Sequence, residues 1–256
     1  MIEISDLPGS VRAAIEAHAI EAYPNEACGL VVLPDSGGPL AYLRCANTAD
    51  DPLKNFRISG EDYISAESVG SIEAVVHSHP GGRAVPSKAD RTTAEAAGVS
   101  LWIIVSVGVQ VDGSIGVEVW GSFSPDGYMA PLIGREFVHG VHDCYSIVRD
   151  WYKVERGVML PDFPRADGWW NDGKSSLYLD NYRAAGFANV GKDATLILGD
   201  VMLMTVLSQN NEPNHAGVYV GDGRMIHHMA GRLSAKVLFG GMWQASHYTT
   251  LRYRGN

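Results

Sequence analysis

The sequence predicts an α+β protein of two domains, each mixing helices with β-strands. Segments with helical and with strand periodicity are interleaved along the 256 residues, and several strands are joined by hairpin turns. Between residues 121 and 132 the chain loses periodicity and becomes rich in turn formers, which indicates a domain boundary. We therefore expect one domain over residues 1–121 and a second over residues 133–256.

The first half predicts an α/β sandwich built on one mixed sheet. Apolar residues at helical spacing predict three helices, at residues 10–22, 60–69 and 87–97. Runs of strand-forming residues predict strands at residues 28–33, 40–45, 56–58, 101–107 and 115–120. A further apolar run containing Val75 and Val76 is bounded by a Pro-Gly-Gly turn and predicts a buried strand.

The second half predicts helices followed by an antiparallel set of strands. An amphipathic helix begins near Asp143, and a second helix is expected over residues 175–185. A strand is expected over residues 199–206, and residues 214–227 read as a hairpin around a Gly-Asp-Gly turn. Residues 247–253 form the closing strand of this domain.

Composition and charge exclude several classes of protein. The net charge of −9 leaves no basic stripe to neutralise phosphates, so we expect no nucleic-acid partner. The longest apolar runs are too short to span a bilayer, and the N-terminus lacks a secretion signal, so we expect no membrane insertion. Three irregularly spaced cysteines predict no disulfide framework, with Cys28 and Cys45 as small core residues.

Two histidines and one aspartate of the first half can meet at one point. His77 and His79 lie two residues apart on the buried strand, so their side chains point the same way. Asp90 follows a turn and lies in the first turn of the next helix. Two imidazoles and a carboxylate suit a catalytic zinc ion that keeps a fourth position for water. The alternative is a capping box, in which Ser87 and Asp90 only cap the helix.

The spacing His-Ser-His-Pro, six residues, then Ser-x-x-Asp resembles the signature of the MPN/JAMM zinc metalloproteases, which hydrolyse isopeptide and peptide bonds. The MPN fold has the mixed-sheet α/β character expected here. The resemblance implies that His77, His79 and Asp90 hold a zinc ion. It also implies that Glu26 is the general base toward water and that Ser87 helps to stabilise the oxyanion.

A cysteine at the start of a helix is the focus of the second half. Cys144 lies in the first helical turn, where the positive end of the helix dipole lowers the pKa of a thiol. His215 and His227 lie at the same end of the predicted hairpin. A cysteine and a histidine oriented by a third polar side chain form the machinery of a thiol peptidase. The alternative is a buried cysteine with a packing role.

The pair Asp143-Cys144, together with the segments GDVML, HAGVYVGDG and MIH, resembles the NlpC-type cell-wall peptidases. These are papain-like α+β enzymes that cut the stem peptides of peptidoglycan. The resemblance implies that Cys144 is the nucleophile, His215 the general base and His227 the residue that orients the base.

Three features depart from that family pattern. Tyr145 and Ser146 follow the cysteine where many members have Ser-Gly. Phe137 stands where a tyrosine usually helps to form the oxyanion site, and a phenyl ring has no hydroxyl to donate. His228 adjoins His227, and a shift of one residue in strand register would exchange their faces.

A zinc peptidase-like domain followed by a thiol cell-wall peptidase resembles the tail assembly or tail tip proteins of long-tailed bacteriophages. This resemblance implies other tail proteins as partners and peptidoglycan peptides as substrate. The protein would be made in the host cytoplasm and reach the wall in the virion tail, without a signal peptide. The alternatives are a structural tail component with one or both sites inactive, and a cellular JAMM isopeptidase.

Overall fold

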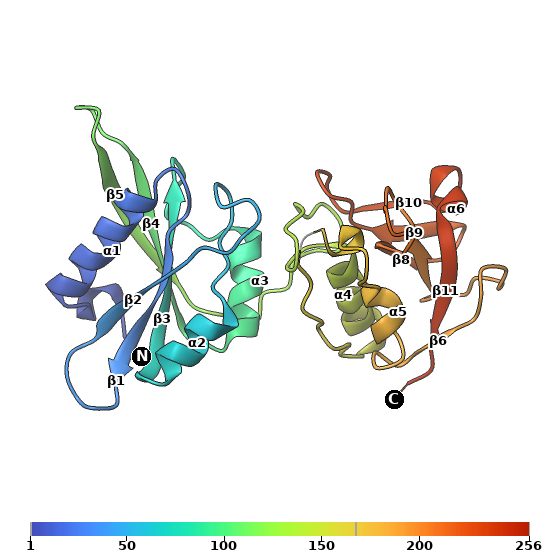
Figure 1. Cartoon of the computed structure of the whole chain (residues 1–256), viewed down its shortest axis with the longest axis horizontal. Helices are drawn as coiled ribbons and strands as arrows, with labels where there is room; N and C mark the ends of the chain where they lie inside the picture. Colours follow the sequence, from blue (N-terminus) through green and yellow to red (C-terminus); the bar gives the residue numbers. More distant parts are fainter. Residues whose placement is uncertain (1, 167, 256) are drawn as a thin grey trace. The chain divides into compact units, whose positions relative to one another are not determined.

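The computed structural model describes residues 2–166 and 168–255, and these form two compact units, Met1–Met129 and Ala130–Asn256 (Figure 1). The two units meet in sequence within the turn-rich segment 121–132. The last strand of the first unit continues to Phe123, two residues beyond the expected end of that domain. Each unit contains its own sheet and its own hydrophobic core.

The first unit is built on a five-stranded sheet with the strand order β2-β1-β3-β4-β5. The strands are β1 (Cys28–Pro34), β2 (Ala41–Cys45), β3 (Gly70–Pro80), β4 (Leu101–Val109) and β5 (Ile115–Phe123). The strands β3 and β4 run parallel, and every other pair in this sheet is antiparallel. The predicted mixed sheet is therefore confirmed.

Helices cover both faces of this sheet, as expected for an α/β sandwich (Figure 1). The helix α1 (Gly9–Ala22) buries Val11, Ile15 and Ala19 against one face. The helices α2 (Gly60–Glu67) and α3 (Lys88–Ala97) pack on the other face, through Ala66 and Ala94. A short helix η1 (Ile4–Asp6) precedes α1. This second face is the one that carries the candidate metal ligands.

The strand predicted over residues 56–58 is wrong, because this segment is an irregular loop. Its backbone is held by residues 47 and 48, which belong to another loop and not to a strand. The Asn47 amide oxygen accepts the Arg57 N–H at 3.1 Å, and the Arg57 carbonyl accepts the Thr48 N–H at 2.9 Å. The loop lays the ring of Phe56 on that of His77, with the centroids 4.4 Å apart.

The second unit contains an antiparallel six-stranded sheet with the order β10-β9-β8-β7-β11-β6. The strands are β6 (Phe187–Asn189), β7 (Val201–Met204), β8 (His215–Tyr219), β9 (Arg224–His227), β10 (Ala235–Leu238) and β11 (His247–Tyr253). The helices are α4 (Cys144–Arg156), η2 (Trp169–Asn171), α5 (Leu177–Asn181) and α6 (Met242–Ala245). The expected hairpin is formed by β8 and β9. The helix predicted over residues 175–185 is shorter in the structure, where it is α5.

The helix α4 lies on one face of this sheet and fixes the position of Cys144 (Figure 1). Ile147 and Val148 of α4 are fully buried in one cluster with Ala216 and Val218 of β8. This contact places the first residue of α4 beside the start of β8, where His215 lies. The expected α+β character of the second domain is thereby confirmed.

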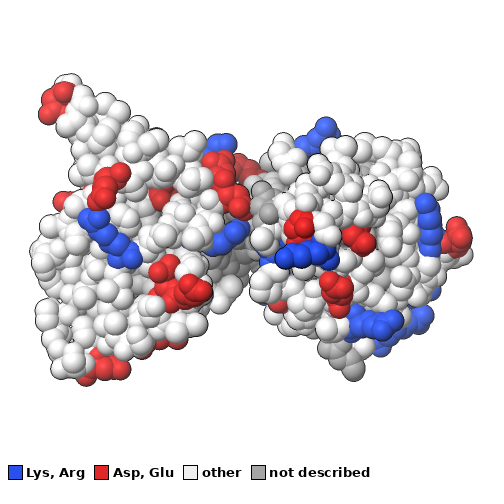
Figure 2. All heavy atoms as spheres, in the orientation of Figure 1, with Lys and Arg blue, Asp and Glu red and all other residues white. Residues whose placement is uncertain are grey.

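Acidic and basic side chains are interspersed on the face of the molecule drawn in Figure 2. Among the described residues, no helix has the length and apolar character needed to cross a membrane.

Candidate functional site

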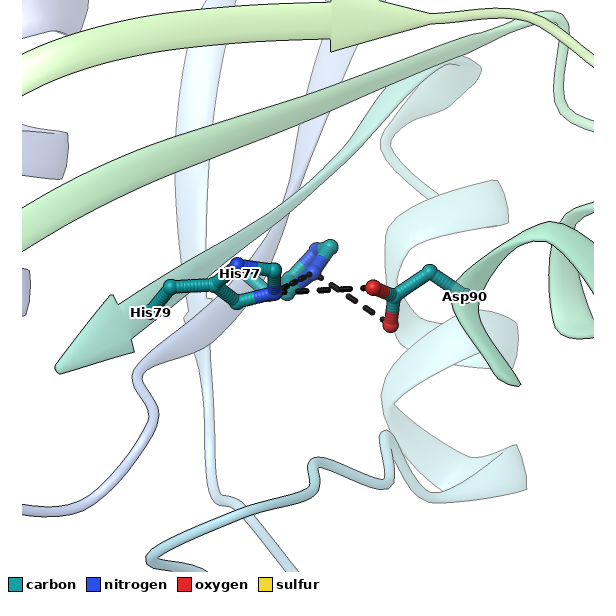
Figure 3. Close-up of side chains that lie close together, drawn as sticks. All are labelled: His77, His79 and Asp90. Atoms are coloured by element: carbon teal, nitrogen blue, oxygen red, sulfur yellow. Dashed lines mark hydrogen bonds and ion pairs between the residues drawn. The ribbon is translucent and has the colours of Figure 1, made fainter. Parts of the chain in front are cut away.

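Three predicted metal ligands converge at the carboxyl end of β3 (Figure 3). The Nε2 atoms of His77 and His79 lie 3.1 Å apart. Asp90 approaches them from α3, with Oδ1 at 3.5 Å from His77 Nε2 and Oδ2 at 3.5 Å from His79 Nε2. One potential ligand atom from each residue lies within 4.8 Å of the others. The arrangement can hold a divalent cation through two nitrogens and one oxygen.

The capping box at the start of α3 is present together with this cluster. The Ser87 N–H donates to Asp90 Oδ2 at 2.7 Å, and the Asp90 N–H donates to Ser87 Oγ at 3.1 Å. The cap holds the Asp90 carboxylate in place while its oxygens face the histidines. Capping and metal binding are therefore compatible roles for Asp90, and Ser87 is exposed at the helix cap.

The electrostatics of the cluster favour a cation. The Nδ1 of His79 lies 2.8 Å from the Arg83 carbonyl, which can only accept, so this nitrogen carries a proton. Burial opposes protonation of His79, but its hydrogen bonds to Asp90 and to this carbonyl, together with the negative charges of Asp90 and Glu26, outweigh burial and raise its pKa. Burial lowers the pKa of His77. The negative charge of Asp90 therefore faces two imidazole nitrogens at the place that a metal ion would take.

The remaining surroundings of the cluster fit a metal ion as well. The His77 side chain is completely buried, and its Nε2 is the nitrogen that faces the Asp90 carboxylate. Burial would raise the pKa of Asp90, but attraction to His77 and hydrogen bonds from both histidines hold it well below its usual range. The carboxylate is thus ionised at neutral pH, which is the form that binds a metal.

Glu26 lies at the edge of this cluster, in the segment that leads into β1. The backbone of the next residue is fixed to β3, because the Ala27 N–H donates to Ser78 Oγ at 2.8 Å. Burial raises the pKa of Glu26 to about 8, and the charge of His79 opposes this shift while that of Asp90 adds to it. Glu26 is not one of the three residues whose ligand atoms gather within 4.8 Å. With this raised pKa, its carboxyl group can exchange a proton near neutral pH.

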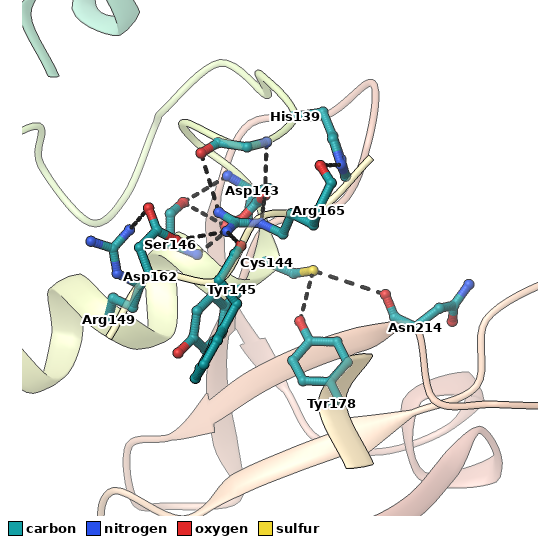
Figure 4. A network of polar contacts seen from close by, with 12 residues as sticks. His139, Asp143, Cys144, Tyr145, Ser146, Arg149, Asp162, Arg165, Tyr178 and Asn214 are labelled. Atoms are coloured by element: carbon teal, nitrogen blue, oxygen red, sulfur yellow. Dashed lines mark hydrogen bonds and ion pairs between the residues drawn. The ribbon is translucent and has the colours of Figure 1, made fainter. Parts of the chain in front are cut away.

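Cys144 is the first residue of α4, and its sulfur faces a tyrosine from another helix (Figure 4). The Sγ atom lies 3.2 Å from the hydroxyl of Tyr178 and 4.0 Å from the carbonyl of Asn214. Asp143 caps α4 by accepting the Ser146 N–H at 2.8 Å. A capped helix therefore presents the thiol at its N-terminal end.

The expectation of a depressed pKa for this thiol is wrong. Burial raises the pKa of Cys144 to about 11, and the negative charge of Asp143 adds to the rise. The hydrogen bond from Tyr178 acts in the opposite direction but is the smaller effect. The loss of solvation outweighs the favourable effect of the helix N-terminus, because removing a thiolate from water costs a large free energy. The thiol is protonated at neutral pH in this state.

The structure brings the two predicted histidines of the second unit together. His215 Nε2 lies 2.9 Å from His227 Nδ1, and the ring of Trp243 stacks on that of His215. Burial lowers the pKa of His215 to about 3 and that of His227 to about 4, so both are neutral at pH 7. His228 points elsewhere, with its ring against Phe137 at a centroid distance of 5.2 Å.

The thiol lies in the same pocket as His215 but is not hydrogen-bonded to its side chain in the described part of the chain. Cys144 and His215 line the same pocket, which has a volume of about 340 Å³. Among the described residues, no hydrogen bond joins their side chains; the sulfur interacts with the Tyr178 hydroxyl, the Asn214 carbonyl and the Ala216 backbone. His228 also lines this pocket. Direct proton transfer from the thiol to His215 would therefore need one of the two side chains to move.

Comparisons with known proteins agree with both halves of the chain. The family described as prokaryotic homologs of the JAB domain matches residues 8–116, and the NlpC/P60 family matches residues 120–252. Tail tip assembly protein K of Escherichia phage N15 is 34% identical over 247 residues, which are 95% of this chain and 95% of that protein. Tail tip assembly protein K of Escherichia phage lambda is 37% identical over 197 residues, 77% of this chain and 89% of that protein.

The chain belongs to the phage tail tip assembly protein K family. The expected resemblance to phage tail proteins with a JAB-type and an NlpC-type domain is thus confirmed.

Two residues at the thiol site of this K family member were not predicted. Tyr178 reaches the sulfur from α5, and no local pattern marks its hydroxyl as different from that of any other tyrosine. Arg165 forms a buried ion pair with Asp143, with Nε and Oδ2 2.6 Å apart. An arginine in a loop is normally solvated, so its burial could only be known from the fold.

Proposed function

We propose that this protein is a phage tail component with two peptidase sites. The first unit would hydrolyse peptide or isopeptide bonds with a zinc ion. The second would cleave peptidoglycan stem peptides with a thiol, during tail assembly or penetration of the host wall. The observation that carries the proposal is the convergence of His77, His79 and Asp90 on one point. Other tail proteins would be its partners, and it would travel from the host cytoplasm to the wall in the virion tail.

At the metal centre, His77, His79 and Asp90 would hold the zinc ion. Zinc supplies a Lewis acid that polarises a carbonyl and makes water a better nucleophile at neutral pH. Glu26 would take a proton from the attacking water and deliver it to the leaving nitrogen, and its raised pKa suits both transfers. A cation nearby would lower that pKa toward neutrality. Ser87 would help to stabilise the oxyanion from the cap of α3.

At the thiol site, Cys144 Sγ would attack the carbonyl carbon of the peptide and pass its proton to His215. Because His215 is neutral at pH 7, it can accept that proton. The contact with His227 uses His215 Nε2, which leaves Nδ1 for the transfer. His215 would then protonate the leaving amine, and water would release the acyl group from the sulfur. The roles of Cys144, His215 and His227 are those implied by the NlpC/P60 family.

A structural tail component with an inactive thiol site is the second candidate function. Two observations favour it: the raised pKa of Cys144, and the absence of a hydrogen bond between the Cys144 and His215 side chains in the described part of the chain. Relatives named as assembly proteins are consistent with this role. Because these relatives are phage proteins, we do not retain the cellular isopeptidase.

Digestion of purified peptidoglycan separates the two candidates. Wild type, Cys144→Ala and His79→Ala proteins are incubated with cross-linked peptidoglycan, and the released muropeptides are identified by mass spectrometry. We expect stem-peptide fragments from wild type and from His79→Ala, and none from Cys144→Ala. Wild type could also release products of a cut cross-link. If His79→Ala does not release them, the first unit cuts that bond. Release of no fragment by the wild type would contradict the thiol peptidase and support the structural component.

A further inference from the structure

We infer that Tyr178 is a catalytic residue of the thiol site, which donates its hydroxyl proton in a hydrogen bond first to the Cys144 sulfur and then to the oxyanion. This inference rests on the proposed thiol peptidase function. It gives the second unit the hydroxyl donor that Phe137 cannot supply.

The position of the Tyr178 hydroxyl is the first support. It lies 3.2 Å from Cys144 Sγ, within the distance of a hydrogen bond to sulfur, and points toward the sulfur from below α4 (Figure 4). The Tyr178 ring is held between two aromatic side chains, edge-on to Tyr145 at 6.2 Å and to Trp169 at 6.1 Å. A ring fixed in this way keeps its hydroxyl in place without loss of side-chain entropy during the reaction.

The protonation state of Tyr178 makes its hydroxyl a donor. Burial and the neighbouring Cys144 raise the pKa of Tyr178 well above its usual value. The phenol is therefore protonated at neutral pH and can donate a hydrogen bond. A phenol that donates to sulfur stabilises the charged form of the thiol, and this opposes the effect of burial on the pKa of Cys144.

The same hydroxyl can serve the next step of the reaction. When the sulfur attacks, a C–S bond forms, the thiol proton passes to His215, and the carbonyl π electrons move to oxygen. That oxygen is bonded to the carbon that the sulfur attacks, so a donor touching the sulfur reaches it by a small rotation. At the start of α4 the Ser146 N–H is taken by the Asp143 cap, whereas the Cys144 and Tyr145 N–H groups have no acceptor within the helix, and one of these two would be the second donor.

The other tyrosines of the pocket do not contact the thiol. Tyr145 and Tyr182 line the same pocket as Phe137 and Tyr178. The Tyr145 hydroxyl donates to a backbone carbonyl at 2.7 Å, and the Tyr182 hydroxyl accepts from Arg183 Nε at 3.1 Å. Tyr182→Phe is therefore a matched control, because it removes a hydroxyl from the same pocket without touching the sulfur.

The first experiment measures the thiol without any substrate. Tyr178→Phe and Tyr182→Phe are compared with wild type in the pH dependence of Cys144 alkylation by iodoacetamide, followed by peptide mass spectrometry. We expect the apparent pKa of Cys144 to rise by about half a unit or more in Tyr178→Phe and to stay unchanged in Tyr182→Phe. The other titratable groups that line the pocket are the same in all three proteins: His139, Asp143, Tyr145, Arg165, His215 and His228.

The second experiment measures stem-peptide cleavage by the same three proteins, after thermal melting has checked their fold. We expect kcat to fall about 100-fold in Tyr178→Phe with little change in KM, and to stay within about twofold in Tyr182→Phe. A wild type that cleaves nothing overturns the peptidase assignment. An active wild type, together with an unchanged alkylation profile and kcat in Tyr178→Phe, overturns only the role of Tyr178.

Discussion

Ser87 combines a capping role with a proposed catalytic one, and substitution can separate the two. Ser87→Ala removes the acceptor of the Asp90 N–H, so we expect the free energy of unfolding of the first unit to fall by about 1 kcal/mol. The three metal ligands stay in place, so zinc should stay bound. Urea unfolding and elemental analysis measure the two effects.

Asp90→Asn is the reciprocal control for this prediction. An asparagine keeps an oxygen that can accept the Ser87 N–H, but it removes the negative charge facing the histidines. We expect this variant to lose zinc while α3 remains capped. Loss of zinc from Ser87→Ala to the same extent would contradict the separation of the two roles.

The buried histidines of the second unit predict a stability that depends on pH. Burial lowers the pKa of His215 to about 3, whereas an unfolded histidine titrates near 6.5. Between these values the unfolded chain binds more protons, so stability is fully present above pH 6.5 and falls as the pH decreases toward 3. Between pH 6.5 and pH 4.5, we expect the wild type to lose about 2 kcal/mol more unfolding free energy than His215→Gln. Urea unfolding at both pH values tests this, and equal losses in variant and wild type would contradict it.

The candidate site was predictable to the extent that it depends on local spacing. His77 and His79 share a strand face because side chains alternate, and Asp90 follows from the capping pattern at the start of a helix. The pKa of Cys144 and the contact made by Tyr178 depend on which segments pack over the thiol. Those contacts join residues 34 positions apart, and no local pattern encodes them.

The N-terminal end of α4 is stabilised by a buried ion pair between its cap residue, Asp143, and Arg165 from a loop. Asp143 caps the helix, and its side chain is 2% exposed beside that of Arg165, which is 9% exposed. Arg165→Met would leave a buried carboxylate without its partner, so we expect a loss of about 3 kcal/mol in unfolding free energy at pH 7. Burial would raise the pKa of Asp143, but Arg165 holds it low in the wild type.

The same pair predicts the direction of the pH effect. Without the arginine, Asp143 takes up a proton more readily in the folded state, so the loss caused by Arg165→Met should shrink as the pH falls toward 4. Arg149→Met is the matched control, because its ion pair with Asp162 is more exposed and contributes less than about 1 kcal/mol. Urea unfolding at pH 7 and pH 4 tests this, and equal effects of the two substitutions would contradict the role of Arg165.

Elements with strong periodicity were predictable, and short or irregular ones were not. The strand β11 has its predicted bounds, and β8–β9 is the predicted hairpin. The short strands β6 and β10 lie at the two edges of their sheet, where β6 has only three residues and β10 is at most half-buried. Residues 56–58 have strand-forming side chains, but Asn47 holds their backbone in a loop. Tertiary hydrogen bonds override local propensity there.

At the scale of the whole molecule, each unit has its own core and its own candidate site. Because only the first unit has a metal site in this account, we expect a chelator to lower its melting temperature by about 5 °C or more. Hydrogen exchange followed by mass spectrometry should then show faster exchange in residues 1–129 and unchanged exchange in residues 130–256. His77→Ala should show no further response to the chelator. An effect on both units alike would contradict the independence of the two sites.

The zinc content of the freshly purified protein tests the central claim most directly. His77, His79 and Asp90 present one ligand atom each within 4.8 Å. We predict about one zinc ion per chain by elemental analysis, and its loss in His77→Ala. A wild-type protein without stoichiometric metal would contradict the account of the first unit.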